Sequence, residues 1–217
     1  MSQAASARTT IRRTFRPIAV GLLVVAAAII GTVVNLHGEP ASSSAPSFSE
    51  IPRREGGDAT IDADGIVTQA DGALPDGATA FDDEYSGVAN LDHDLLQALR
   101  DATSDAADDG IGVNVNSGWR SPDYQDQLLH EAVSEYGSAE EAARWVATAD
   151  TSPHVSGYAV DLGPFDATGW MSEQGAEYGL CQIYDNEPWH YELRPEAIDR
   201  GCPPRYVDPT HDPRMQQ

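Results

Sequence analysis

The sequence predicts an α+β fold in which helices pack on a small antiparallel sheet, and three observations lead to this class. Apolar residues at helical spacing dominate between residues 91 and 147. Short strand-like runs dominate between residues 158 and 193. The helices therefore come early and the strands late, which is unlike the regular alternation of strand and helix in a doubly wound parallel sheet.

The first elements follow an irregular segment. Residues 60–90 are rich in Asp, Gly and Ala, so we expect irregular structure with one short strand at most. From Leu91 to Ala102 apolar residues recur at helical spacing, and Gly110 is a suitable stop. Apolar residues alternate with Gly and Asn over residues 111–116, which predicts a strand.

Two further helices are marked by their capping residues. Ser121 is an N-cap followed by a proline, and it begins a helix that Gly137 ends. Ser138 and Glu141 form a capping box, which begins a helix that we expect to run to about Ala147.

The strands lie in the last third of the chain. A loop over residues 148–157 precedes a predicted strand at 158–162. A segment with Gly, Trp and Met follows, which has room for a short helix. Two more strands are predicted, at 180–184 and 188–193.

The charges divide the chain into two parts. The whole chain has a formal charge of −22. Residues 1–38 carry four arginines and no carboxylate, whereas residues 39–217 carry nine arginines and all 35 carboxylates, a formal charge of −26. Nucleic acid is excluded as a partner of the acidic part, because a phosphate backbone needs a basic face.

The basic tail, residues 1–17, precedes an apolar run at residues 18–36. The run has about 17–19 residues, near the lower limit for a helix that spans a membrane. A cleavable signal peptide and an uncleaved signal-anchor are the two interpretations, and the poor cleavage site behind the run favours the anchor. A buried core helix is disfavoured, because no amphipathic period is present.

The arginines of the tail keep the N-terminus in the cytoplasm, so the acidic part is expected on the outer side of the cell membrane as a single-pass protein. Residues 37–59 have the composition of a flexible linker. Residues 60–217 then form one folded domain.

The two cysteines, Cys181 and Cys202, lie in this exported part. In an oxidising compartment a pair this close in sequence is expected to form a disulfide. A zinc site on them is disfavoured, because neither cysteine has a second one at the usual two-residue spacing.

Two short stretches, 152–161 and 187–190, gather residues used in catalysis. They contain two imidazoles, His154 and His190, and two carboxylates, Asp161 and Glu187. Two His and one Asp with water in the fourth position describe a catalytic zinc site, and Glu187 is then free to act as the general base.

Three motifs resemble those of the VanY-type D-alanyl-D-alanine carboxypeptidases. The pattern Ser-x-His-x-x-Gly-x-Ala-x-Asp is present from Ser152 to Asp161, and Glu-x-Trp-His from Glu187 to His190. The third motif, Ser-Gly-Trp-Arg-Ser, contains Arg120 and is followed by Gln125. The resemblance covers about residues 80–205.

The resemblance implies one Zn²⁺ per chain, bound by His154, Asp161 and His190, with Glu187 as the catalytic base. It also implies that Arg120, together with Ser152 and Gln125, binds the carboxylate at the end of a peptidoglycan stem peptide. Independently of the family, an exopeptidase must recognise a free carboxylate, and a guanidinium does so with two parallel hydrogen bonds.

The expected reaction is hydrolysis of the terminal D-Ala-D-Ala bond outside the cell. Only 25 residues separate Asp161 from Glu187, so the segment that often carries a lid in this family is short and specificity stays open. The alternatives are an L,D- or D,L-peptidase on the same scaffold and a non-catalytic cell-wall-binding module.

Overall fold

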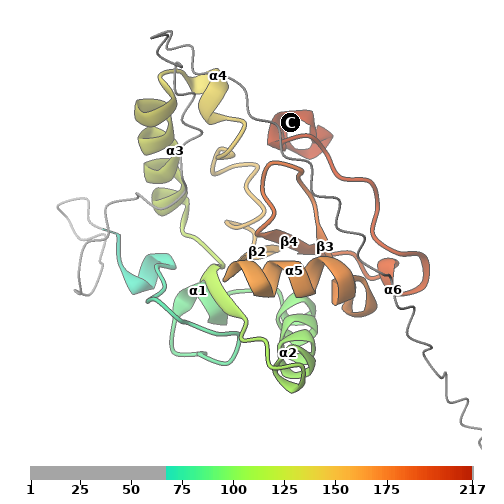
Figure 1. Cartoon of the computed structure of the whole chain (residues 1–217). Helices are drawn as coiled ribbons and strands as arrows, with labels where there is room; N and C mark the ends of the chain where they lie inside the picture. The colour runs from blue at the N-terminus through green and yellow to red at the C-terminus, as the bar shows by residue number, and fades with distance from the viewer. Residues whose placement is uncertain (1–66, 217) are drawn as a thin grey trace, which may run out of the picture. The chain divides into compact units, whose positions relative to one another are not determined.

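Residues 67–216 are described by the structure, a computed structural model, and are drawn in colour in Figure 1. The predicted tail, apolar run and linker, and the predicted domain start at residue 60, lie outside the described residues. Within 67–216, every helix is too short or too polar to cross a membrane.

Four strands form one sheet in the order β1-β2-β4-β3, and each neighbouring pair is antiparallel, as the sequence predicted. The strands are β1 (Asn114–Ser117), β2 (Ala159–Gly163), β3 (Leu180–Gln182) and β4 (His190–Leu193). In this register Asp161 of β2 lies between Ser117 and His190 on the two neighbouring strands.

Six α-helices and four short 3-10 helices surround this sheet in the described part of the chain. The α-helices are α1 (Ser86–Ala89), α2 (His93–Asp108), α3 (Pro122–Tyr136), α4 (Ala139–Ala142), α5 (Phe165–Gln174) and α6 (Ala197–Arg200). The 3-10 helices are η1 (Gln69–Asp71), η2 (Gly175–Tyr178), η3 (Pro209–His211) and η4 (Pro213–Gln216).

The predicted N-cap serines and the glycine that ends α3 are present. Of the predicted capping box at Ser138, only the serine's bond is formed, and the Glu141 side chain pairs with Arg144 instead. The Ser121 side chain accepts a hydrogen bond from the backbone N–H of Tyr124 at the start of α3, and Ser138 does the same for Glu141 at the start of α4. Gly137 ends α3 with a φ of +80°, a left-handed conformation that suits glycine.

The hydrophobic core lies on one face of the sheet. Figure 1 shows α5 running across the strands with α2 beside it, and both helices contact the sheet. Val160 and Leu162 of β2 pack into this core with Leu95 and Leu99 of α2. Since neighbouring side chains of a strand point to opposite faces, Asp161 points away from the core.

Two predicted elements are shorter than expected, because contacts with distant residues replace the backbone hydrogen bonds that would have continued the helix or the strand. The helix predicted to run to Ala147 ends at Ala142. Beyond it, the carbonyl of Arg144 accepts from the Asn186 side chain, and the carbonyl of Ala147 accepts from Gln125. The strand predicted at 180–184 ends at Gln182, and residue 184 instead forms an isolated bridge to residue 206.

The start of the sheet also differs from the prediction. The strand β1 begins at Asn114 rather than at residue 111, because the amide of Ile111 bonds back to Ala106 at the end of α2. The described part of residues 60–90 forms η1, α1 and turns and contains no strand.

The last strand begins only after a bend. A strand was predicted at 188–193, but β4 starts at His190, and the amide of His190 bonds to the carbonyl of Glu187 at 3.1 Å. This turn brings Glu187 and His190 to the same side of the sheet.

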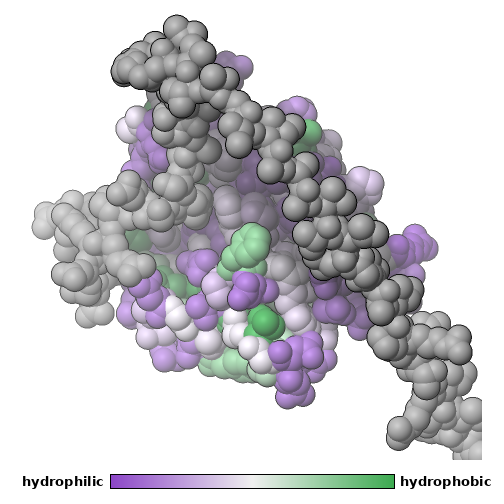
Figure 2. Space-filling model, in the orientation of Figure 1, coloured by the Kyte–Doolittle hydropathy of each residue, from purple (hydrophilic) through white to green (hydrophobic). Residues whose placement is uncertain are grey.

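Figure 2 shows that hydrophilic residues predominate over the described part of one face of the molecule, in agreement with the acidic composition.

Candidate metal centre

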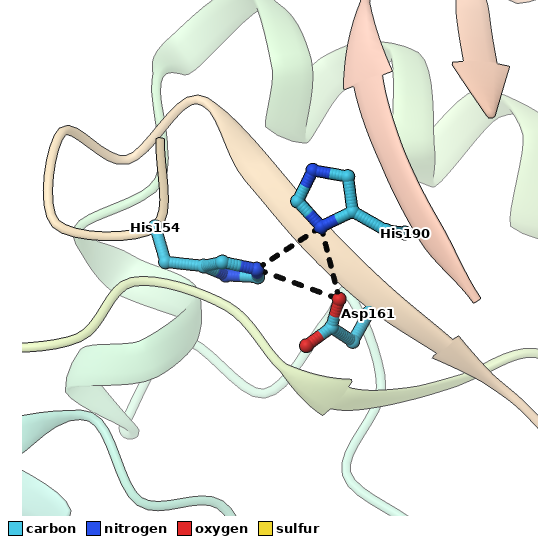
Figure 3. A group of neighbouring side chains, drawn as sticks. All are labelled: His154, Asp161 and His190. Carbon is cyan, nitrogen blue, oxygen red and sulfur yellow. Dashed lines mark hydrogen bonds and ion pairs between the residues drawn. The ribbon is translucent and has the colours of Figure 1, made fainter. Parts of the chain in front are cut away.

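Three side chains converge on the sheet face opposite the core, and they are the three predicted from the sequence (Figure 3). His154 comes from the turn before β2, Asp161 from β2 and His190 from the start of β4. The Nε2 atom of His154 lies 3.4 Å from Oδ1 of Asp161, and Nδ1 of His190 lies 3.3 Å from the same oxygen. The two ring nitrogens lie 3.3 Å apart.

The outer nitrogens of both histidine rings are held by acceptors. Nδ1 of His154 lies 2.8 Å from the carbonyl oxygen of Gly118, which can only accept, so this nitrogen carries the proton. Nε2 of His190 lies 3.3 Å from Oε1 of Glu192. When a metal is bound, donation outward would leave the lone pair of each inner nitrogen free to bind it.

This donor set fits a zinc ion. Two imidazole nitrogens and a carboxylate oxygen lie within 4.8 Å of one another. Burial alone would lower the pKa of His190, but Asp161 and Glu192 raise it to about 10, so a proton on Nδ1 takes the place that a metal cation would fill. Two His and one carboxylate match the three protein ligands of catalytic zinc sites, which keep a further position for water or substrate.

The electrostatics of the cluster keep Asp161 ionised. Burial alone would raise the pKa of Asp161, but the two histidines and the charge of Arg120 hold it well below its usual value. Burial lowers the pKa of His154, and the positive charge of Arg120 lowers it further. The cluster thus contains an ionised carboxylate and a neutral His154, the forms that bind metals.

Glu187 stands beside the cluster with an unused oxygen. Its side chain is 7% exposed, and its Oε2 lies 3.7 Å from Nδ1 of His190. Its Oε1 has no hydrogen-bond partner among the described residues. Burial raises the pKa of Glu187 to about 8, against the opposing effect of His190. A buried carboxyl oxygen without a partner is costly, and the other oxygen of the same group lies beside the ligand cluster, where a general base could act.

Arg120 is fixed at the end of β1 by three contacts. Its Nε donates to Ser117 Oγ at 2.7 Å, and its two terminal nitrogens donate to Gln125 Oε1 at 3.1 Å and to Asp161 Oδ2 at 2.7 Å. A guanidinium has five N–H groups, so one N–H on each terminal nitrogen is left beyond these contacts. The predicted substrate residue is therefore also a direct neighbour of a predicted metal ligand.

The other two predicted substrate residues are buried. Gln125 is 1% exposed, and its amide links the Arg120 guanidinium to the carbonyl of Ala147. Ser152 is also 1% exposed, and its carbonyl accepts from the Ser156 hydroxyl in the turn that carries His154. Both residues thus lie next to the predicted site. Gln125 supports the side chain of Arg120, and Ser152 supports the turn that carries His154.

Three further contributors were missed by sequence reasoning. Ser117 holds Arg120, the carbonyl of Gly118 holds His154, and Glu192 holds His190. Ser117 and Gly118 belong to the third motif, but a backbone carbonyl gives no sequence signal. Glu192 did have a sequence signal, because it lies two residues after His190 in a strand, and side chains two residues apart in a strand share a face.

The predicted disulfide is confirmed. Cys181 of β3 and Cys202 are bonded, with 5.6 Å between their Cα atoms. Since β3 pairs with β4, the bond ties the chain after α6 to the strand that neighbours the one carrying His190.

Comparison with known proteins gives a family match over the part of the chain that carries the three motifs. The family model described as VanY, D-alanyl-D-alanine carboxypeptidase, matches residues 88–196, half of the chain. A D-alanyl-D-alanine carboxypeptidase of Enterococcus faecalis (strain ATCC 700802 / V583) is 31% identical over 134 residues. The match covers 50% of this chain, and the chain spans about half the length of that relative (50%).

Two solved structures are similar to parts of the chain. A zinc complex of a mutant vancomycin resistance D,D-pentapeptidase VanY is 28% identical with a TM-score of 0.45, covering 48% of this chain and 72% of the other. VanYB in complex with D-alanine-D-alanine is 27% identical with a TM-score of 0.48, covering 51% and 74%. On its family match, which includes all three motifs, the chain belongs to the VanY family of D-alanyl-D-alanine carboxypeptidases.

Proposed function

We propose that the chain is a zinc-dependent carboxypeptidase that removes the terminal D-Ala from peptidoglycan stem peptides ending in D-Ala-D-Ala. The observation that carries this proposal is the unpartnered Oε1 of the buried Glu187, beside three converging ligand atoms. Membership in the VanY family and the E. faecalis relative support the choice of substrate.

His154, Asp161 and His190 would hold the zinc, which when bound supplies a Lewis acid and lowers the pKa of a water molecule. Glu187 accepts the proton of the attacking water at its carboxylate and later delivers it to the leaving amine. Its pKa of about 8 suits both roles, because a general acid-base group works best with a pKa near the operating pH.

Arg120 would select the substrate by its free end. The two N–H groups that remain on its terminal nitrogens can bind both oxygens of a carboxylate. Ser117, Gln125 and Asp161 fix the guanidinium, so little side-chain entropy is lost when a peptide binds. A fixed carboxylate receptor beside the ligand cluster favours an exopeptidase over an endopeptidase.

A peptide panel tests the reaction. The full-length chain is incubated with zinc and a stem pentapeptide ending in D-Ala-D-Ala, and released D-Ala is quantified by chromatography. We expect release that a chelator abolishes and zinc restores, and much slower release of D-alaninamide, quantified in the same way, from the same peptide with a C-terminal amide. Absence of release from the free-acid pentapeptide would refute the proposal.

The same panel distinguishes the alternatives. A tetrapeptide whose terminal D-Ala follows an L-residue is a substrate for an L,D-peptidase and a poor one for a D,D-enzyme. Binding of the pentapeptide without any release would favour a non-catalytic wall-binding module.

We further propose that residues 18–36 anchor the chain in the cell membrane, with residues 1–17 inside and the catalytic domain (60–217) outside on the linker 37–59. The support is the division of charge between the basic tail and the acidic remainder. Protease added to intact spheroplasts should then remove the domain, and a domain protected until lysis would contradict this topology.

A further inference from the structure

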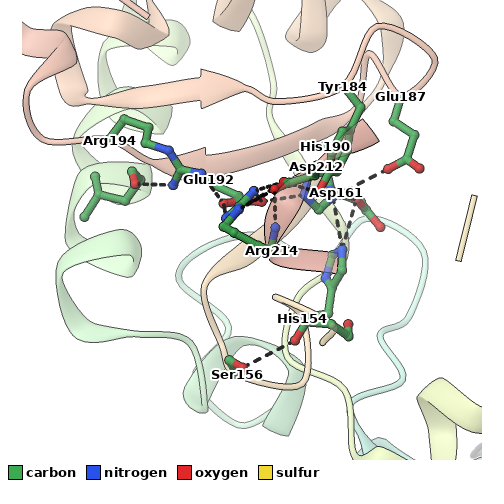
Figure 4. Close-up of polar contacts among 12 residues, drawn as sticks. His154, Ser156, Asp161, Tyr184, Glu187, His190, Glu192, Arg194, Asp212 and Arg214 are labelled. Atoms are coloured by element: carbon green, nitrogen blue, oxygen red, sulfur yellow. Dashed lines mark hydrogen bonds and ion pairs between the residues drawn. The ribbon is translucent and has the colours of Figure 1, made fainter. Parts of the chain in front are cut away.

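A buried network lies behind His190, on the side away from Asp161 (Figure 4). Glu192 is only 1% exposed, and its Oε1 lies 3.3 Å from Nε2 of His190. A buried carboxylate is stable as an anion only when donors or cations compensate it. The partners of Glu192 therefore decide whether it can hold the His190 ring.

Arg214 is the partner that reaches both oxygens of Glu192. Its Nη1 donates to Oε2 at 2.6 Å and its Nη2 donates to Oε1 at 3.1 Å, so the guanidinium binds the carboxylate in a bidentate manner. Arg194 adds a contact to Oε2 alone, at 2.6 Å. Of the two arginines, only Arg214 therefore contacts the oxygen that faces His190.

The guanidinium of Arg214 is itself oriented by Asp212. The Nε atom of Arg214 donates to both carboxylate oxygens of Asp212, at 3.1 and 3.0 Å, and the Asp212 side chain is fully buried. The Tyr184 hydroxyl donates to Asp212 Oδ2 at 3.1 Å, and the Tyr184 ring packs against His190 with 5.1 Å between centroids.

The network thus balances two carboxylates, Glu192 and Asp212, with two guanidiniums. Arg214 and Asp212 lie between residues 208 and 216, beyond the matched family region 88–196. The segment that contains η3 and η4 is therefore connected to His190 of the candidate metal centre through one carboxylate, that of Glu192.

We propose that Arg214 is a positioning residue of the metal centre, which through Glu192 fixes the ring of His190 with Nδ1 directed at His154 and Asp161. This inference rests on the proposed function only in so far as the three residues bind zinc. Without the bidentate contact from Arg214, only Arg194 still binds Glu192, at Oε2. The oxygen Oε1 of Glu192 and the ring of His190 then lose their fixed orientation.

Zinc affinity of the full-length chain tests this role. Arg214→Met, Arg214→Lys and the control Arg205→Met are compared by competition with a chromophoric chelator. Arg205 lies in the same part of the chain and pairs with the exposed Asp185 at 2.6 Å, so the control also removes one arginine ion pair.

We expect Arg214→Met to weaken zinc binding about 10- to 100-fold, as other partners of metal-binding histidines do when removed. Arg214→Lys keeps the charge without the fork and should weaken binding less, and Arg205→Met should bind as the wild type. Wild-type affinity of a folded Arg214→Met chain overturns the proposal. If Arg214→Met does not fold, Arg214→Lys decides, and wild-type affinity in that variant overturns it.

A second readout separates positioning from general stability. In the zinc-loaded chain, the Nε2 proton of His190, followed by NMR, should exchange slowly with water because Glu192 accepts it, and Arg214→Met should make this exchange several-fold faster. Exchange as slow in Arg214→Met as in the wild type would contradict the proposed positioning.

The proposal and the proposed function fail in different ways. A wild type that binds zinc but releases no D-Ala refutes the peptidase, while the affinities of the variants still decide the role of Arg214. A wild type that binds no zinc refutes both.

Discussion

Arg120 donates a hydrogen bond at 2.7 Å to Oδ2 of Asp161, the residue whose other oxygen faces both histidines of the cluster. Both side chains are 13% exposed, so water screens this ion pair little. The candidate metal centre and the candidate carboxylate receptor are thus coupled through one side chain, and substitutions at either should be examined for effects on the other.

Removal of a predicted ligand should abolish tight zinc binding. The wild-type chain is expected to retain one zinc after gel filtration, and His154→Ala or His190→Ala less than a tenth of that, because two ligands hold zinc far more weakly than three. Elemental analysis by mass spectrometry measures the content. The control is His130→Ala on the exposed surface of α3, and loss of zinc in this control or retention in the ligand variants would argue for another site.

Arg120→Lys should lower kcat/KM for the free-acid pentapeptide by about 10- to 100-fold. A lysine keeps a positive charge near Asp161 but lacks the planar fork, and a hydrogen bond between charged groups contributes about 1.5–3 kcal/mol. The preference for the free acid over the C-terminal amide should shrink in parallel. If the variant loses activity equally on both peptides, Arg120 supports Asp161 rather than the substrate.

Reduction of the Cys181–Cys202 disulfide should lower the free energy of unfolding by about 3 kcal/mol, the value expected in the chain-entropy model for a loop of this length. Urea titrations with and without a reductant measure the difference. The double variant Cys181→Ala, Cys202→Ala should be insensitive to the reductant. Equal stability of oxidised and reduced wild type would show that the bond does not stabilise the domain.

Asp208 should make the domain sensitive to acid. Burial alone would raise its pKa, but hydrogen bonds from Thr210, His211 and Arg144 hold the pKa at about 2. The unfolded value is about 3.9, so the folded state binds this proton less readily. The carboxylate therefore stabilises the fold above about pH 4, and this contribution is lost as the pH falls from about 4 towards 2.

The variant Asp208→Asn isolates this effect. Urea titrations at several pH values should show the wild type more stable than the variant at pH 7, with a difference that narrows below about pH 4. A difference that stays constant down to pH 3 would assign the role of Asp208 to its hydrogen bonds rather than to its charge.

Local signals in the sequence predicted the elements whose ends are decided locally. Ser121 and Gly137 bound α3 because a side-chain cap and a left-handed glycine act within a few residues. The three ligand candidates could be chosen because they stand in motifs whose order and residue types fit a zinc peptidase. Pro188 lies two residues before His190, at the bend that precedes β4, and a proline is a local signal for such a bend.

Contacts between distant residues could not be predicted in this way. The end of α4 depends on side chains of Gln125 and Asn186 that bind carbonyls beyond it. The pairing of Arg214 with Glu192 joins residues 22 positions apart, one in η4 and the other in β4, and no periodic pattern in the sequence connects them. The predicted membrane segment and linker lie outside the described residues and stay predictions.

The variant Glu187→Gln separates zinc binding from catalysis. The amide has nearly the shape of the carboxyl group but cannot accept a proton, so zinc binding should be retained while kcat for D-Ala release falls about 10²- to 10⁴-fold. Glu173→Gln, at an exposed position of α5, is the matched control and should keep wild-type kcat. Zinc-loaded Glu187→Gln that releases D-Ala at the wild-type rate would contradict Glu187 as the catalytic base.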